Sequence, residues 1–421
     1  MTLSIITLSW LEKIFPKKHL NHFHMTYTET TTTSYVERLG NSIKGIFFGI
    51  LFIIWSIVLL SWNEGRTIDT TTGLAEGQKL TVEGNVSPIN TALEWKLVHI
   101  NGKADTTEIL MDDIFRVQKN AIKLIRTVEM YQWKEISKTR THDNVDGSET
   151  KTTTYTYDKI WSKESINSSS FHESWHENPV FRNLSSTAIT STGVKIGDMQ
   201  LSSNFVNQMD NEESILLEMK VFQKWRIFGK LKKTFATSNI SMENNAVYIW
   251  MASGSLSVPD IGDLRVSFSA VYPAEVSVIW QQQANNLVSY KTKSDMSIAL
   301  LQYGNASIEQ MYTKANSDNI FIAWILRWVG LLLMFIGFNL LFWLIVMIAK
   351  IIPFIADMLS IGTGLISLLL TLVVWWWTIL IAWLFVRPLI SVLIWVVVVW
   401  TVFMILKSKK RRGNGGGMEN G

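Results

Sequence analysis

The chain has 421 residues, of which 48% are hydrophobic and 18% are charged, with 19 Trp, no Cys and a formal net charge of +4. The apolar residues are concentrated in runs that are too long for a soluble core, which indicates an integral membrane protein. Because there is no cysteine, the sequence excludes disulfide scaffolds, Cys-ligated metal centres and thiol catalysis.

The N-terminal 44 residues are predicted to be a cytosolic segment. Residues 1–24 do not fit a signal peptide, because the apolar stretch 3–11 is short and its basic residues follow it. Met25 begins a Thr-rich lead, residues 26–34, and is a more natural start. We therefore expect that residues 1–24 need not be native and that the lead is disordered.

Four apolar segments are long enough to cross a bilayer as helices, which takes roughly 20 residues each. They are residues 45–63, 320–349, 365–386 and 389–406. Arg327 lies near the outer end of the second segment, where we expect its side chain to extend into water. Arg387 and Pro388 alone separate the last two segments and predict a tight hairpin. The sequence therefore predicts four transmembrane helices.

The charges predict the orientation of these helices. Lys44, Lys350 and the basic tail 407–421 fall on one side of the layout, whereas residues 64–319 carry 26 Lys and Arg against 30 Asp and Glu. The positive-inside rule then places both termini in the cytosol and residues 64–319 outside it. We expect residues 350–364 to be a cytosolic interfacial loop in which an amphipathic helix keeps Asp357 in water. A basic stripe for nucleic acid is not visible.

Residues 64–319 are predicted to form one β-rich α+β domain. A helical stalk continues the first span toward Gly77, and short helices are expected near 202–208 and 307–312. Strands are expected at 96–100, 128–136, 155–161, 264–271 and 276–280. Asn101-Gly102 predicts a hairpin turn after the first strand, and Asp146-Gly147 predicts the tip of a long hairpin. The fold class is thus a multi-pass helical membrane protein with a large extramembrane domain between helices 1 and 2.

One motif suggests metal chemistry. His172-Glu173-Ser174-Trp175-His176 fits H-E-x-x-H, which binds Zn²⁺ when both histidines share one helical face. Pro179 and the preceding serines leave at most two helical turns, so we predict no catalytic, cofactor-binding or metal site. His99 and His142 are expected to be structural or solvent-facing. The third and fourth apolar segments show no polar stripe, which argues against a conducting path.

Several strings resemble the transmembrane protein 43 family, in order, from about residue 35 to residue 406. They are Asn63-Glu-Gly-Arg66, Leu74-Ala-Glu-Gly77, Lys96-Leu-Val-His-Ile-Asn-Gly102, Val128-Glu-Met-Tyr-Gln-Trp133, Gly262-Asp-Leu-Arg-Val-Ser-Phe-Ser269, Pro353 to Gly362, and Trp383-Leu-Phe-Val-Arg-Pro-Leu389. The resemblance implies four spans, a large domain between the first two, and organisation of membrane protein complexes with emerin and lamins at the endoplasmic reticulum and inner nuclear membrane. It also implies that the family's lone histidine followed by x-Asn-Pro is His176, with Asn178 and Pro179.

The function predicted on these grounds is a non-enzymatic membrane scaffold. Its partners are the lipid bilayer, other membrane proteins and a second copy of the chain, with no nucleic acid, cofactor or small-molecule substrate. The alternatives are an ion channel or transporter component and, more remotely, a zinc-dependent hydrolase. The localisation is the inner membrane in a bacterium, or the endoplasmic reticulum and inner nuclear membrane in a eukaryote.

Overall fold

The computed structural model describes residues 26–144, 146–180, 184–217, 239–250, 254–284, 286–349 and 353–386, together with Val396, Trp400 and Met404. Residues 1–24, the turn at 387–388, most of the expected fourth helix and the tail 407–421 lie outside this part. Three of the described helices are long and apolar enough to cross a membrane. The structure therefore supports a multi-pass membrane protein, and the fourth span stays a prediction.

The described helices are α2 (Tyr35–Leu80), α3 (Ser203–Gln208), α6 (Ile308–Ala349) and α7 (Pro353–Val386). The hydroxyl of Ser34 caps α2 by accepting a hydrogen bond from the amide of Glu37. The predicted stalk is confirmed, because α2 continues well beyond the first apolar segment. The interfacial segment 350–364 was expected to contain a helix, and it is helical from residue 353 onward, since α7 begins at Pro353, a residue whose fixed φ suits the first turn of a helix. Its position at the cytosolic interface stays a prediction. The backbone at Asp357 is therefore helical, and its side chain is outside the described part.

The domain between α2 and α6 is built on two large sheets, the first of which also includes β1, from the chain before α2. The first sheet has the order β1-β7-β6-β14-β13-β12, with β8 beside β6 and β11 beside β14. Its strands are β1 (Thr26–Thr33), β6 (Lys123–Asp143), β7 (Glu149–Ser162), β8 (Thr187–Thr190), β11 (Glu212–Ser214), β12 (Asn239–Glu243), β13 (Ala246–Trp250) and β14 (Leu264–Val271).

The second sheet has the order β19-β15-β16-β10-β9-β3-β2, and β15 also pairs with β3. Its strands are β2 (Val82–Glu83), β3 (Leu97–Asp105), β9 (Lys195–Ile196), β10 (Met199–Gln200), β15 (Ala274–Gln283), β16 (Asn286–Val288) and β19 (Leu300–Tyr303). Two small ribbons pair β4 (Ile109–Met111) with β5 (Gln118–Asn120), and β17 (Tyr290–Lys291) with β18 (Ser297–Ile298). The β-rich α+β prediction for this domain is confirmed.

Each sheet has its own hydrophobic core, and a third cluster joins the domain to the helices. The alternating burial of β14 places Leu264, Val266 and Phe268 in the first core. Trp280 of β15 is fully buried in the second core. The third cluster packs Leu74 of the α2 stalk against Tyr312 at the start of α6. The stalks of α2 and α6 are thus part of the folded domain.

The strand predictions were confirmed in most places and wrong at one turn. β6 and β7 form the long hairpin, and β14 has the predicted bounds. The predicted turn at Asn101-Gly102 is wrong, because β3 runs through it and pairs with β15 from Leu97 to Ala104. Gly102 instead allows β3 to lie close to Ile196 of β9, since a Cβ at Gly102 would lie 2.7 Å from Cγ2 of Ile196.

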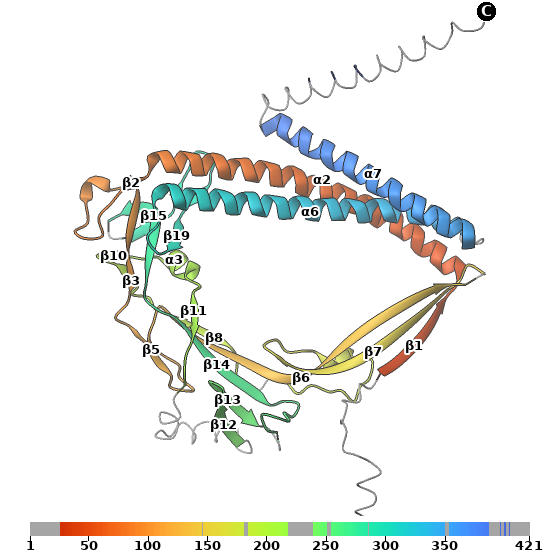
Figure 1. The fold of residues 1–421 in the computed structure, drawn as a ribbon, viewed down its shortest axis with the longest axis horizontal. Coiled ribbons are helices and arrows are strands. Elements are labelled where there is room, and N and C mark those ends of the chain that lie inside the picture. Colours follow the sequence, from red (N-terminus) through yellow and green to blue (C-terminus); the bar gives the residue numbers. More distant parts are fainter. Residues whose placement is uncertain are drawn as a thin grey trace, which may run out of the picture.

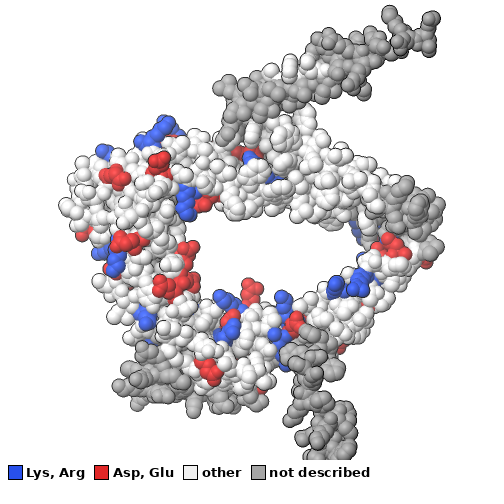
Figure 2. Space-filling view, viewed as in Figure 1, with Lys and Arg blue, Asp and Glu red and all other residues white. Residues whose placement is uncertain are grey.

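The β6–β7 hairpin and β1 form a three-stranded extension that we call the arm. In Figure 1 the arm leaves the domain, passes below the α2–α6 pair and meets the start of α2, so that the chain surrounds an opening. The same opening is visible in Figure 2, where the helical side is almost white and blue and red side chains lie along the sheet side. The opening therefore has a helical border with few charged residues and a charged sheet border.

The prediction that residues 26–34 are disordered was wrong. Residues Thr26 to Thr33 pair with β7 residue by residue, and Thr30 lies opposite Thr152. Arg38 locks this pairing to the hairpin tip: its guanidinium lies 2.7 Å from Asp143 and 3.0 Å from Glu149, and it donates to the carbonyl of Gly147. These contacts place Arg38 and β1 beside the hairpin tip. The predicted placement of residues 1–44 in the cytosol and of residues 64–319 outside it stays a prediction.

Candidate functional site at the helix junction

The α2–α6 contact follows a seven-residue repeat of small and polar residues. On α2 the repeat consists of Ser42, Gly49, Ser56 and Asn63, all of them buried. Three of them face Gly337, Gly330 and Ala323, which step by seven in the opposite direction along α6. A repeat of seven residues keeps the same face of each helix in contact when two helices supercoil. We call this α2–α6 contact face the seam. The prediction from sequence missed this signal.

Close backbone approach is what the small residues provide. A Cβ added at Gly49 would lie 2.8 Å from the carbonyl oxygen of Gly337, and one added at Gly337 would lie 2.7 Å from Cγ1 of Ile53. Ser56 donates to the carbonyl of Gly330 at 2.7 Å, and Asn63 donates to the carbonyl of Ala323 at 3.1 Å. The seam therefore combines packing with hydrogen bonds across the two helices.

A buried ion pair lies directly beside the last seam position, between Glu64, which follows Asn63, and Arg327, one turn from Ala323 on α6. Nε and Nη2 of Arg327 donate to the two carboxylate oxygens of Glu64 at 2.6 and 2.7 Å. Glu64 is 1% exposed and Arg327 is 13% exposed. The prediction that Arg327 extends into water was wrong. A bidentate partner lies on the neighbouring helix, and pairing offsets part of the cost of burying both charges.

The third helix is tied to the same carboxylate. The indole of Trp383 on α7 donates to Oε2 of Glu64 at 2.7 Å, and the indole of Trp375 donates to the carbonyl of Arg327 at 3.1 Å. The guanidinium also lies 4.9 Å from the ring centre of Trp324. We call Glu64, Arg327 and Trp383 the latch. Both oxygens of Glu64 accept hydrogen bonds, so the latch suits a structural tie better than proton transfer.

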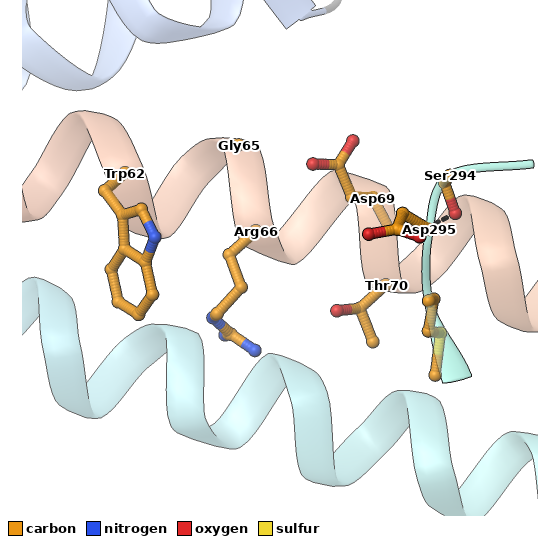
Figure 3. Close-up of a pocket in the computed structure, with 8 residues that line it drawn as sticks. Trp62, Gly65, Arg66, Asp69, Thr70, Ser294 and Asp295 are labelled. Carbon is orange, nitrogen blue, oxygen red and sulfur yellow. Dashed lines mark hydrogen bonds between the residues drawn. The ribbon is translucent and has the colours of Figure 1, made fainter. Parts of the chain in front are cut away.

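The next turn of α2 continues the polar contact and borders a cavity. Arg66 donates to Oδ1 of Asn319 at 3.0 Å, and Asn319 donates to the carbonyl of Thr67. Beside these contacts lies a cavity of about 410 Å³ between α2 and the β17–β18 ribbon. Figure 3 shows Trp62 and Arg66 on the same side of α2, with the ribbon against the following turns.

A polar stripe runs along α7, contrary to our prediction for the third segment. Ser367, Thr371 and Thr378 lie on one face and are all buried. The hydroxyl of Thr378 donates to the carbonyl of Val374, whereas those of Ser367 and Thr371 have no hydrogen-bond partner among the described residues. Small buried hydroxyl residues favour close helix packing, so we interpret the stripe as a packing face.

The H-E-x-x-H segment does not form the helix that zinc binding would need. Residues 171–178 form bends and turns, and each histidine stacks on a different tyrosine of β7. The ring of His172 lies 4.4 Å from that of Tyr155, and the ring of His176 lies 3.6 Å from that of Tyr157. Among the described residues, no group of three His, Asp or Glu side chains is placed to hold a metal ion.

His176 and Asn178 hold a loop against the arm. The side chain of Asn178 accepts from the amide of Trp133 at 2.7 Å and donates to its carbonyl at 2.9 Å, as a neighbouring strand would. His176 is 2% exposed between the rings of Tyr157 and Trp175, and this burial lowers its pKa. The isolated His99 is structural as predicted, because its ring nitrogens contact Glu83 and the carbonyl of Ala306.

Comparisons with known proteins cover most of the chain. The family model described as Transmembrane protein 43 matches residues 130–388. Transmembrane protein 43 of Homo sapiens is 33% identical over 386 residues, which is 88% of this chain and 92% of that protein. The Transmembrane protein 43 homolog of Drosophila melanogaster is 27% identical over 300 residues, which is 69% of this chain and 74% of that protein. No solved structure matches the chain.

Proposed function

The chain belongs to the transmembrane protein 43 family, and we propose that it is a non-enzymatic scaffold that binds other membrane proteins or a second copy of itself. The observation that carries this proposal is the arm. Its strands extend far from the hydrophobic cores, and most side chains of β1 and of the outer half of β6 are exposed. Such a surface offers contact area to a partner without contributing much to the fold.

The outer edge of β1 gives the arm a specific way to bind. β1 is the last strand of its sheet and pairs only with β7 among the described strands. An unpaired strand edge presents backbone N–H and C=O groups in a row, and an extended segment of another chain can add to it. The Thr-rich sequence of β1 has high strand propensity, which favours such addition. A protein segment that adds as a strand is therefore the partner we propose.

The helices support the proposal by fixing the base of this surface. The seam joins α2 to α6, and the latch joins both to α7, so the three helices form one unit. The cluster around Leu74 and Tyr312 then connects that unit to the domain. A scaffold needs this kind of rigid connection between a membrane anchor and a binding surface. Placement at the inner nuclear membrane or endoplasmic reticulum remains a prediction from the family resemblance.

Crosslinking from the edge of β1 tests the proposal. The chain lacks cysteine, so Thr30→Cys introduces a single thiol on β1 for a photoreactive thiol reagent in native membranes. Ser165→Cys, in an exposed loop away from the edge, is the matched control. We expect Thr30→Cys to yield dimers or discrete partner adducts that the control lacks. Equal adducts from both positions, or none from either, would contradict the proposal.

A further inference from the structure

The cavity beside Arg66 lies where the apolar part of α2 ends. It is lined by Trp62, Gly65, Arg66, Asp69 and Thr70 of α2 and by Ser294, Asp295 and Met296 of the β17–β18 ribbon. The hydroxyl of Ser294 donates to the carbonyl of Asp69 at 3.0 Å, which holds the ribbon against the helix. Figure 3 shows this arrangement. The cavity thus has one wall from the helix and one from the domain.

The lining residues change in character along the helix axis. Trp62 is 58% exposed and closes the apolar stretch, as aromatic residues do at membrane interfaces. Arg66 lies about 6 Å farther along the axis and Asp69 about 10 Å farther, at 1.5 Å per residue. The polar layer on each side of a bilayer is about 5–7 Å thick. With Trp62 at the end of the hydrocarbon and α2 along the bilayer normal, Arg66 falls at the depth of the lipid phosphates and Asp69 at the outer limit of the headgroups.

The guanidinium of Arg66 has hydrogen-bond donors available for a ligand. Arg66 makes one good hydrogen bond, at 3.0 Å to Asn319, and longer contacts of 3.5 and 3.4 Å to Asn63 and Thr67. Its Nε has no hydrogen-bond partner in the described part of the chain but is shielded from solvent, so a ligand in the cavity would contact the terminal nitrogens. Among the described residues Arg66 takes part in no ion pair, because the neighbouring carboxylate of Glu64 pairs with Arg327 instead. A guanidinium of this kind is well suited to a phosphate.

The outer end of the cavity is acidic. Asp69 forms no ion pair with a described residue, and Asp295 pairs at 2.8 Å with Lys291, both of these side chains being largely exposed. An exposed pair of this kind contributes little and is easily opened. Aromatic rings are absent from the residues lining this end, so the wall offers hydrogen-bond acceptors and no cage for a quaternary amine. Two carboxylates favour a primary ammonium, which can donate three hydrogen bonds.

We propose that this cavity binds the headgroup of a phosphatidylethanolamine-type lipid, with its phosphate on Arg66 and its ammonium group between Asp69 and Asp295. The lipid's own order of acyl chains, phosphate and ammonium matches the order of Trp62, Arg66 and Asp69 along α2. Such a lipid joins the membrane surface to the β17–β18 ribbon of the domain, which is a contact that neither the seam nor the latch provides.

Gly65 allows the cavity to be filled without disturbing the helix. A Cβ at Gly65 meets no atom within 4 Å, and the same holds for Gly40 near the other end of α2. Gly65→Leu therefore projects a side chain into the lipid space, whereas Gly40→Leu is a matched control for the change in helix propensity. Asp69→Asn and Arg66→Gln separately test the ammonium and phosphate ends.

Native mass spectrometry of the delipidated full-length protein can measure binding of added phosphatidylethanolamine and phosphatidylglycerol. We expect phosphatidylethanolamine to bind about tenfold more tightly, because phosphatidylglycerol lacks the ammonium group and one charge-assisted hydrogen bond corresponds to about a tenfold change. Asp69→Asn should remove the preference, Arg66→Gln should weaken both lipids, Gly65→Leu should abolish binding and Gly40→Leu should change nothing.

Three results would overturn the assignment. The two lipids could bind equally to the wild-type protein, or Gly65→Leu could retain full binding while its melting temperature matched that of Gly40→Leu. Inorganic phosphate could displace the lipid as well as soluble phosphoethanolamine does, in which case the cavity is a simple anion site. Because β1 precedes the start of α2 and this cavity lies on the second half of that helix, each result is independent of the crosslinking test for the arm.

Discussion

Glu64 is buried, and both of its carboxylate oxygens accept hydrogen bonds. We therefore expect removal of its partner Arg327 to destabilise the folded protein. Arg327→Met leaves an uncompensated charge between three helices, and breaking such a pair costs about 3–5 kcal/mol. Glu64→Gln together with Arg327→Met removes both charges and should recover much of the loss. Melting temperatures of the purified protein in detergent would show this order. A double variant no more stable than Arg327→Met would contradict the role of the latch.

The depressed pKa of His176 makes a prediction about acid stability. Burial is its main cause, and the nearby carboxylates of Glu173 and Glu135 only partly oppose it. The unfolded chain binds a proton near pH 6.5, whereas the folded protein does not until a lower pH. Above pH 6.5 His176 is uncharged in both the folded and the unfolded chain, so it does not make stability depend on pH there. Below pH 6.5 the unfolded chain binds the proton first, and the free energy of unfolding therefore falls.

His176→Phe should flatten this pH dependence, because an aromatic ring still stacks between Tyr157 and Trp175 but takes up no proton. The matched control is His142→Phe, at an exposed position on the outer half of β6. Denaturant unfolding of the domain between pH 5 and pH 8, followed by circular dichroism, measures the slope. An unchanged slope in His176→Phe would show that another group controls acid stability.

At the scale of elements, the α2–α6 seam should be intolerant of larger side chains. Gly337→Leu places atoms within contact distance of Ile53 and of the carbonyl of Gly49, which forces the helices apart. Overpacking of this kind costs about 1–3 kcal/mol. We expect the melting temperature in detergent to fall for Gly337→Leu and to stay unchanged for Gly40→Leu, whose new side chain is in open space. Equal melting temperatures would remove the seam as a determinant of helix pairing.

Sequence patterns predicted elements wherever a local period determines the structure. The alternation in β14 and the Asp146-Gly147 tip are local, and both were predicted correctly. The Asn101-Gly102 turn failed because pairing with β15 outweighs a two-residue preference. The Thr-rich lead failed because its structure depends on β7, more than a hundred residues away.

Local sequence patterns could not predict the latch, because its residues also lie far apart in the sequence. Glu64 and Arg327 were each visible in the sequence, but only packing of the two helices shows that they meet. The seven-residue repeat from Ser42 to Asn63 is a signal in the sequence that predicts the register of the α2–α6 pair. Glu64 directly follows the last residue of that repeat, so the register by itself brings Glu64 close to Arg327.

The described part of the molecule forms a frame around the opening, with α2 as one long side and β6 as the opposite side, and these two elements are of similar length. The 46 residues of α2 extend about 69 Å at 1.5 Å per residue, and the 21 residues of β6 extend about 69 Å at 3.3 Å per residue. The arm can therefore contact both ends of α2. Arg140, Asp143, Glu149 and Lys151 at the end of the hairpin are too polar for hydrocarbon. The contact of β1 with this end must then form in water on one side of a membrane.

Paired cysteines test whether the frame closes in membranes. Thr30 lies opposite Thr152 and Thr31 opposite Lys151, and in an antiparallel ladder neighbouring pairs alternate between the two spacings. One of these two pairs therefore has the closer spacing, and we expect mild oxidation of native membranes to form a disulfide in at least one double-cysteine variant. Thr30→Cys with Ser165→Cys is the control and should not form one.

A membrane-impermeant maleimide must also label positions 30 and 152 from the same side of sealed vesicles once Arg38→Gln has loosened the contact. If neither pair forms a disulfide and the two positions are labelled from opposite sides, α2 separates β1 from the arm across the bilayer. The frame would then be open in the membrane, and the scaffold's binding surface would consist of β6 and β7 alone.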